Sequence, residues 1–398
     1  MKPFAAPFAL PFVIACALSL PAMADDTTTS GLIRDKGLAV AETTLDGQPP
    51  SNDRDMALTA VRFLMGIEAA YQARWRVGST EFFVSFPILG TELIPNPSPE
   101  PLRPDFLNVL ATDLSTAMEK TRDGMPDEGA LVLELNDLWF DMNSNGTMDD
   151  GEQLLSVMGM MQGEDAPSTI RFDTADLHWL RAYSHLIEGM AQTALAFNPE
   201  PVLERRIAFR AELERQHTDP PTDEVLERTM YSQAQMLGPI VDDVAAVVQL
   251  LRQTPDKPRI AAAADHFRQM IAANRTFWSA VETETDDDRE WIPNDRQKAA
   301  LGFELPPGTA TAWQEVLSDA EAVLDGTKLV PFWRFAPGHG IDLAQWIKEP
   351  GPIDLMDWVQ GSGALPYAKD GETVDRDNWD QFASMLDGDA FLYMVLLN

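Results

Sequence analysis

Long helical patterns separated by short breaks constrain the fold of this chain more than any other feature. Between residues 256 and 281 apolar side chains recur every three or four positions, so they fall on one face of a helix. At residues 55–76 a similar stripe is interrupted only by Glu68. Further helical patterns occupy residues 105–120, 173–197, 201–216 and 310–324. Because no fixed repeat period accompanies them, we predict a mainly α fold with an irregular helical array or an α-solenoid-like body.

Proline, glycine and charge mark the breaks between these patterns. Five prolines between residues 95 and 104 exclude a helix there, and a second candidate boundary is the acidic stretch at 282–292. Both lie within a predicted helical body of residues 54–325. Residues 25–53 are polar, which predicts a flexible leader. In residues 326–398, prolines and glycines separate short apolar pieces that contain four tryptophans, so we expect a loop-rich segment packed on the body.

The first 24 residues have the pattern of an export signal. Lys2 precedes an apolar run from Phe8 to Leu20, and small residues end at Ala24. We expect cleavage after Ala24, which predicts a periplasmic or secreted bacterial protein with no later transmembrane segment. An alternative stays open, because residues 13–16 resemble a loose lipobox in which Cys16 would carry a lipid anchor.

Charge and cysteine content exclude several classes of function. The chain has 63 acidic and 30 basic residues, a net charge of −33, and should repel nucleic acid and anionic membrane surfaces. Its one cysteine is Cys16. After cleavage, the chain would therefore have no disulfide, thiol nucleophile or thiolate metal site. The expected partner is an envelope protein or a small ligand.

One stretch of twelve residues has both the residue types and the spacing of a metal site. From Asp141 to Glu152, side chains with oxygen atoms occupy alternate positions around Gly146. The pattern resembles the EF-hand calcium loop, D-x-[DN]-x-[DN]-G-x5-E. That resemblance implies a Ca²⁺ ion bound by Asp141, Asn143, Asn145, the carbonyl of Thr147, Asp149 and the two carboxylate oxygens of Glu152.

The sequence around this loop leaves its setting open. An EF-hand enters its loop from a helix, but two polar residues, Asn136 and Asp137, stand where such a helix buries apolar side chains. The alternation of Leu131, Leu133 and Leu135 fits a strand equally well. Since no second loop of this pattern occurs, we expect a structural ion rather than a switch.

A second candidate centre lies on the predicted helix 173–197, which opens with the spacing of a capping box. His178 and His185 are seven residues apart on nearly one face, with Asp176 and Glu188 close by. With ligands from another helix, these residues could hold zinc or iron in a periplasmic hydrolase or metalloenzyme. Because neither an H-E-x-x-H nor a paired E-x-x-H motif is present, zinc and iron are less favoured than calcium.

No nucleophile, phosphate-loop or dinucleotide motif occurs in the chain, so catalysis is not predicted. We therefore expect an exported cell-envelope protein with one structural calcium site, which acts as a binding or scaffolding module.

Overall fold

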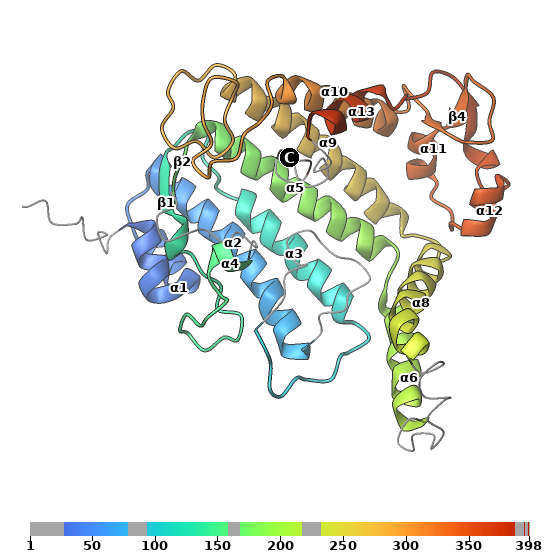
Figure 1. Cartoon of the computed structure of the whole chain (residues 1–398), viewed down its shortest axis with the longest axis horizontal. Helices are drawn as coiled ribbons and strands as arrows, with labels where there is room; N and C mark the ends of the chain where they lie inside the picture. Colours follow the sequence, from blue (N-terminus) through green and yellow to red (C-terminus); the bar gives the residue numbers. More distant parts are fainter. Residues whose placement is uncertain are drawn as a thin grey trace, which may run out of the picture.

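The computed structural model describes residues 28–78, 94–157, 168–216 and 232–386, together with Met394 and Leu397. The predicted export signal, including Cys16, lies outside these residues. Within them the chain is mainly helical and forms the predicted irregular helical array (Figure 1). No helix in these ranges is both long and apolar enough to cross a membrane.

The body is a row of helices in which each packs on the next (Figure 1). In order across the row these are α1 (Thr29–Asp46), α2 (Asn52–Val77), α3 (Phe106–Arg122), α5 (Thr174–Ala196), α9 (Lys257–Val281) and α10 (Thr309–Asp325). The most extensive contact joins α5 to α9. Gly189 permits their close approach, because a Cβ atom there would lie 2.7 Å from a ring carbon of Phe267. As predicted, α5 begins with a capping box between Asp173 and Asp176.

One apolar core runs through the whole row. It contains Ile33 of α1, Val61 of α2, Ile271 of α9 and Phe382 of α13 (Asp377–Met385), and it also includes Leu397. Residues on both sides of the proline-rich connector and of the acidic stretch therefore contribute to a single core.

The prediction of a flexible leader is wrong for residues 29–46, which form α1. Ile33, Leu38 and Ala41 are buried there. At Gly37, a φ of 75° interrupts the helix, and the indole of Trp139 lies over this point and donates a hydrogen bond from Nε1 to the carbonyl of Ile33 (2.7 Å). The few apolar side chains of this segment are ordered by tertiary packing, which composition alone does not report.

A small antiparallel sheet carries the chain into the predicted calcium loop. β1 (Leu131–Glu134) pairs with β2 (Thr169–Phe172), and the 3-10 turn η1 (Leu135–Asp137) follows β1. The short helix α4 (Leu154–Val157) follows the loop. Of the two alternatives for the entering segment, the structure therefore has the strand.

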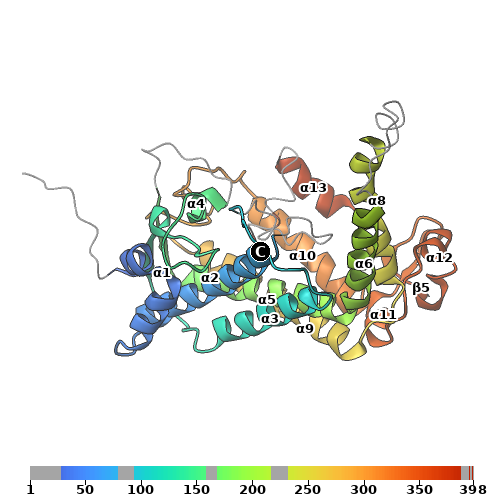
Figure 2. The same ribbon diagram turned by 90° about the horizontal axis from the view of Figure 1, so that it is seen from below.

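An arm and a lobe extend beyond the end of α5 and the start of α9 (Figures 1 and 2). The arm consists of α6 (Glu200–Gln216) and α8 (Ser232–Leu251), which project away from the body. The lobe is the loop-rich segment 326–371. It contains β3 (Val330–Pro331), β4 (His339–Ile341), β5 (Ala368–Asp370), α11 (Leu343–Lys348), α12 (Leu355–Gln360) and the turn η3 (Leu365–Tyr367).

A second, smaller apolar cluster joins the base of the arm and the lobe to the ends of α5 and α9. Its members are Ala196, Phe197, Leu250, Leu251, Ile260, Trp346, Ile347 and Ile353.

Candidate metal centre

Backbone hydrogen bonds hold the two ends of the predicted calcium loop together. The N–H of Phe140 donates to the carbonyl of Glu152 (2.9 Å), and the N–H of Leu154 donates to the carbonyl of Leu138 (2.9 Å). The first and last candidate ligands, Asp141 and Glu152, therefore lie at the same end of the loop.

Inside the loop, the side chains at alternate positions accept hydrogen bonds from the backbone that wraps around them. The carboxylate of Asp141 accepts from the N–H groups of Asn145 and Gly146, both at 2.9 Å. The side-chain oxygen of Asn145 accepts from the N–H of Thr147 (2.7 Å). Gly146 has a φ of 76°, in the left-handed region that favours glycine, so the tight turn needs this residue at the sixth position.

Glu152 closes the loop from the inside. Its side chain is fully buried, and its two carboxylate oxygens accept from the N–H groups of Met142 and Asp149, both at 2.8 Å. The carboxylate of Asp149 in turn accepts from the side-chain amides of Asn143 and Asn145, both at 2.7 Å. All six predicted ligand residues thus belong to one small hydrogen-bonded unit.

Helix α2 contributes two side chains to this unit that the sequence did not single out as ligands. Glu68 accepts a hydrogen bond from the N–H of Asp141 (2.8 Å), and Gln72 donates one to the carbonyl of Asp141 (2.8 Å). The available signal was Glu68 itself, the one charged residue within an otherwise apolar stripe. Both contacts fasten the first residue of the loop to the helical body.

Within the described ranges, the carboxylates in and beside the loop are not matched by positive charges. Burial raises the pKa of Glu68 to about 7, with a further contribution from the carboxylates of Asp141 and Glu152. Burial also raises the pKa of Glu152, and Asp149 and Asp141 add to this effect. In the part of the chain that the structure describes, no ion pair links a lysine or arginine to any of these four carboxylates.

The carboxylates do not converge on one point. Among the described residues, no group of three or more His, Cys, Asp or Glu side chains has the mutual placement of a metal site. Within the loop, the amides of Asn143 and Asn145 lie against Asp149. Three of the six predicted ligands, from Asn143, Asn145 and Thr147, are amide or backbone oxygens and so do not belong to the His, Cys, Asp and Glu side chains considered above.

The second candidate centre is assembled differently from the prediction. Nδ1 of His185 lies 3.0 Å from Nδ1 of His266 on α9, and Nε2 of His266 lies 3.3 Å from Glu188. Arg122 of α3 forms an ion pair with Glu188. Asp176 instead caps α5, and no described contact joins His178 to this cluster. The sequence missed His266 and Arg122 because they lie on other helices, far away along the chain.

Charges within this cluster are balanced. Burial acts to raise the pKa of Glu188, but the hydrogen bonds from His266 and Arg122 outweigh burial and hold this pKa at about 2. Burial lowers the pKa of His185 to about 3, and the positive charge of Arg122 adds to this effect. An ionised Glu188 paired with Arg122 beside a neutral His185 is a network that joins α3, α5 and α9 without further ligands.

Comparison of the chain with known protein families, curated proteins and solved structures found no match. Its function is therefore inferred from its own residues.

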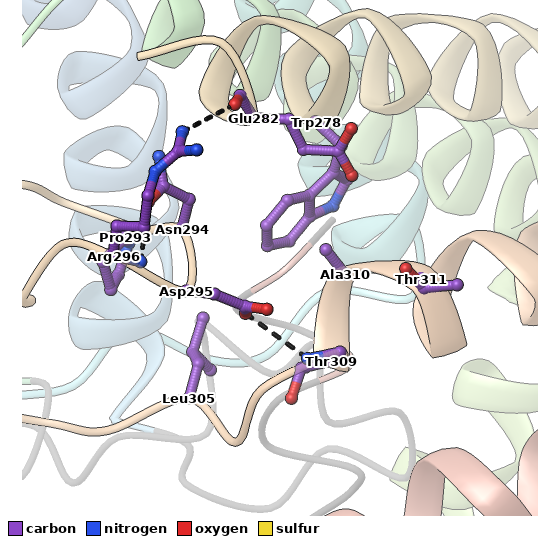
Figure 3. Close-up of a pocket in the computed structure, with 11 residues that line it drawn as sticks. Trp278, Glu282, Pro293, Asn294, Asp295, Arg296, Leu305, Thr309, Ala310 and Thr311 are labelled. Atoms are coloured by element: carbon purple, nitrogen blue, oxygen red, sulfur yellow. Dashed lines mark hydrogen bonds between the residues drawn. The ribbon is translucent and has the colours of Figure 1, made fainter. Parts of the chain in front are cut away.

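A cavity of about 300 Å³ lies between the end of α9, the loop that follows it and the start of α10 (Figure 3). Trp278 of α9 and Thr309 of α10 are among the residues that line it. The charged side chains around it fasten the loop: Arg296 donates to the carbonyls of Glu282 and Glu284, both at 2.9 Å, and Asp295 accepts from the N–H of Gly308 (3.3 Å). None of the predicted site residues lines this cavity.

Proposed function

We propose that residues 141–152 bind one calcium ion. The ligands are Asp141, Asn143, Asn145, the carbonyl of Thr147, Asp149 and Glu152. The observation that carries this proposal is the full burial of Glu152 beside Glu68, Asp141 and Asp149, with no lysine or arginine paired to any of them in the described residues. Burying ionised carboxylates without a counter-charge is costly, and a divalent cation that prefers hard oxygen ligands supplies the missing charge.

The ion has a structural role in this proposal. Its loop is entered from β1 and is fastened to α2 through Glu68 and Gln72, so a bound ion would fix the segment 135–157 against the helical body. Calcium switches open a pair of helices, whereas this loop has a strand on its entering side.

At the level of the whole protein, we propose an exported cell-envelope protein that acts by binding or scaffolding. Three features support this proposal: the export-signal pattern, a net charge of −33, and the lack of a catalytic motif in the sequence. Extracellular calcium modules bind their ion at about 10⁻⁴–10⁻³ M, a range that suits a loop with only three charged ligands. The partner is an envelope protein or a small ligand.

The test is the melting temperature of the purified protein in a chelator and in about 10 mM calcium, which is roughly 10 to 100 times the expected dissociation constant. That excess stabilises the folded state by about 1.4–2.7 kcal/mol. For a chain of this length, with an unfolding entropy of about 2.1 cal/mol/K per residue, the melting temperature rises by about 2–3 °C.

Two variants make the test specific. Asp141→Ala removes a ligand and should abolish the rise. Asp150→Ala removes a neighbouring, exposed carboxylate outside the ligand set and should leave the rise intact. A melting temperature that is the same in chelator and in calcium would contradict the proposal, as would an equal loss of the effect in both variants.

A further inference from the structure

Helix α8 has more apolar surface than its neighbours cover. Asp242 and Asp243 are its only charged residues. Four large aliphatic side chains between residues 237 and 244 are 48–62% exposed: Leu237, Ile240, Val241 and Val244. A helix that is apolar over most of its surface is normally buried, so we expect a partner to cover this surface.

The exposed side chains continue a face that is already buried at the base of the arm. Leu251, the last residue of α8, belongs to the apolar cluster with Trp346 and Ile353 of the lobe. Val244 and Leu237 precede Leu251 by seven and fourteen residues, so they lie on nearly the same side of the helix. Toward the tip of the arm, Leu237, Ile240 and Val241 on this side of the helix are about half exposed or more.

Helix α6 covers a different part of α8. Arg206 of α6 donates a hydrogen bond to Asp243 of α8 (2.6 Å), so one of the two charges of α8 is engaged within the arm. The exposed patch of Leu237, Ile240, Val241 and Val244 contains no charged residue. Two such patches can face each other without opposing like charges at their centre.

We propose that this patch packs on the same patch of a second copy, so that two chains are joined through their arms. The net charge of −33 makes most of the two surfaces repel each other. The arm projects from the body (Figures 1 and 2), and the patch begins seven residues, about 10 Å, from the base of α8. This distance is slightly longer than the Debye length of about 8 Å at physiological salt, so contact through the patch leaves the repulsion between the two bodies weakened but not removed.

Spacing and area also fit a second copy. Leu237, Val241 and Val244 are four and three residues apart, the alternation with which two helices pack side by side. A patch of this kind covers on the order of a few hundred Å². Two patches with their rims approach the roughly 1,000 Å² that a specific interface needs, so the dimer should be weak.

Sedimentation equilibrium of the chain that begins at Asp25, between about 1 and 200 µM, tests the proposal. The measured mass should rise from that of one chain toward that of two. Because the patch is apolar and the bodies repel, added salt should strengthen the association. A mass that stays at that of one chain over the whole concentration range, at low salt and at about 0.5 M salt, would overturn the proposal.

The double substitution Val241→Glu and Val244→Glu places charges on the patch and should weaken the dimer by about 100-fold or more. Val40→Glu with Val109→Glu is the matched control, because these valines are 47% and 49% exposed on α1 and α3. The control should associate as the wild type does. All four positions are exposed, and circular dichroism checks that each variant is folded. A dimer that survives the arm substitutions, or is lost in the control, would exclude this interface.

A crosslink tests the symmetry of the pair. When two copies of α8 pack antiparallel about a two-fold axis, the Val241 positions near the middle of the patch come together. In the chain that begins at Asp25, which has no cysteine of its own, Val241→Cys should form a covalent dimer on mild oxidation, whereas Val109→Cys should not. The absence of a crosslink through Val241→Cys would overturn the two-fold packing of the patch.

Discussion

Replacing His185 should remove part of the acid sensitivity of this fold. His185 is 7% exposed, and its ring faces His266, Glu188, Arg122 and Arg181. Glu188 is already engaged by Arg122 and His266, so a proton on His185 would add a positive charge next to Arg122 in a buried site. Burial, with the help of Arg122, therefore lowers the pKa of His185 to about 3.

The magnitude follows from the difference between the folded and unfolded states. An unfolded histidine has a pKa of about 6.5, so between pH 6.5 and pH 3 the unfolded chain binds a proton that the folded chain does not. The stability contribution of a neutral His185 is thus fully present above pH 6.5 and decreases as the pH falls. Between pH 8 and pH 5, the expected loss is about 2 kcal/mol in the free energy of unfolding.

The effect of His185 on stability can be told apart from that of Glu188, because the two groups change stability in different pH ranges. The pKa of Glu188 is about 2 in the folded state and ordinarily 4.5, so its stabilising contribution is lost only when the pH falls below about 4.5. Buried acids with a raised pKa, such as Glu68, change stability in the opposite direction. They do so equally in wild type and variant, so they cancel in the difference.

Urea denaturation of the wild type and of His185→Gln at pH 8, 6.5 and 5 measures the effect. The difference in unfolding free energy should shift by about 2 kcal/mol in favour of the variant between pH 8 and pH 5. His339→Gln, at a side chain that is 51% exposed, is the control for the loss of one histidine. A difference between wild type and His185→Gln that stays constant with pH would refute the reasoning.

Two further substitutions test the helix contacts. Gly189→Ala places a Cβ atom 2.7 Å from a ring carbon of Phe267 and should lower the free energy of unfolding by about 1–3 kcal/mol, because it disturbs the α5–α9 contact. Urea denaturation measures this loss. Alanine normally stabilises a free helix relative to glycine, so a gain in stability would contradict the tight packing. Asp173→Ala removes the acceptor for the N–H of Ala175 and should lower the free energy of unfolding by about 1 kcal/mol. Asp173→Asn should retain most of the cap and therefore most of this stability. Equal losses in the two variants would exclude the capping role.

The local geometry of the candidate metal centre was more predictable than its surroundings. The spacing from Asp141 to Glu152 was enough to predict a tight turn at Gly146 with the oxygen-bearing side chains of alternate residues directed inward, because these features depend on neighbouring residues only. The contacts from Glu68 and Gln72 required α2 to pack against the loop. In the same way, His266 and Arg122 meet Glu188 only because three helices come together.

The sequence by itself determined most of the helices and the breaks between them. The periodicity of residues 256–281, the cap at Asp173 and the prolines between residues 95 and 104 act through local sterics and hydrogen bonds, which operate within a few residues. Tertiary structure decided what those patterns leave open. It ordered residues 29–46 as α1 through Trp139 and selected a strand before the candidate metal loop. It also left Leu237, Ile240, Val241 and Val244 of α8 exposed, because burial depends on which distant segments meet, and no local pattern contains that information.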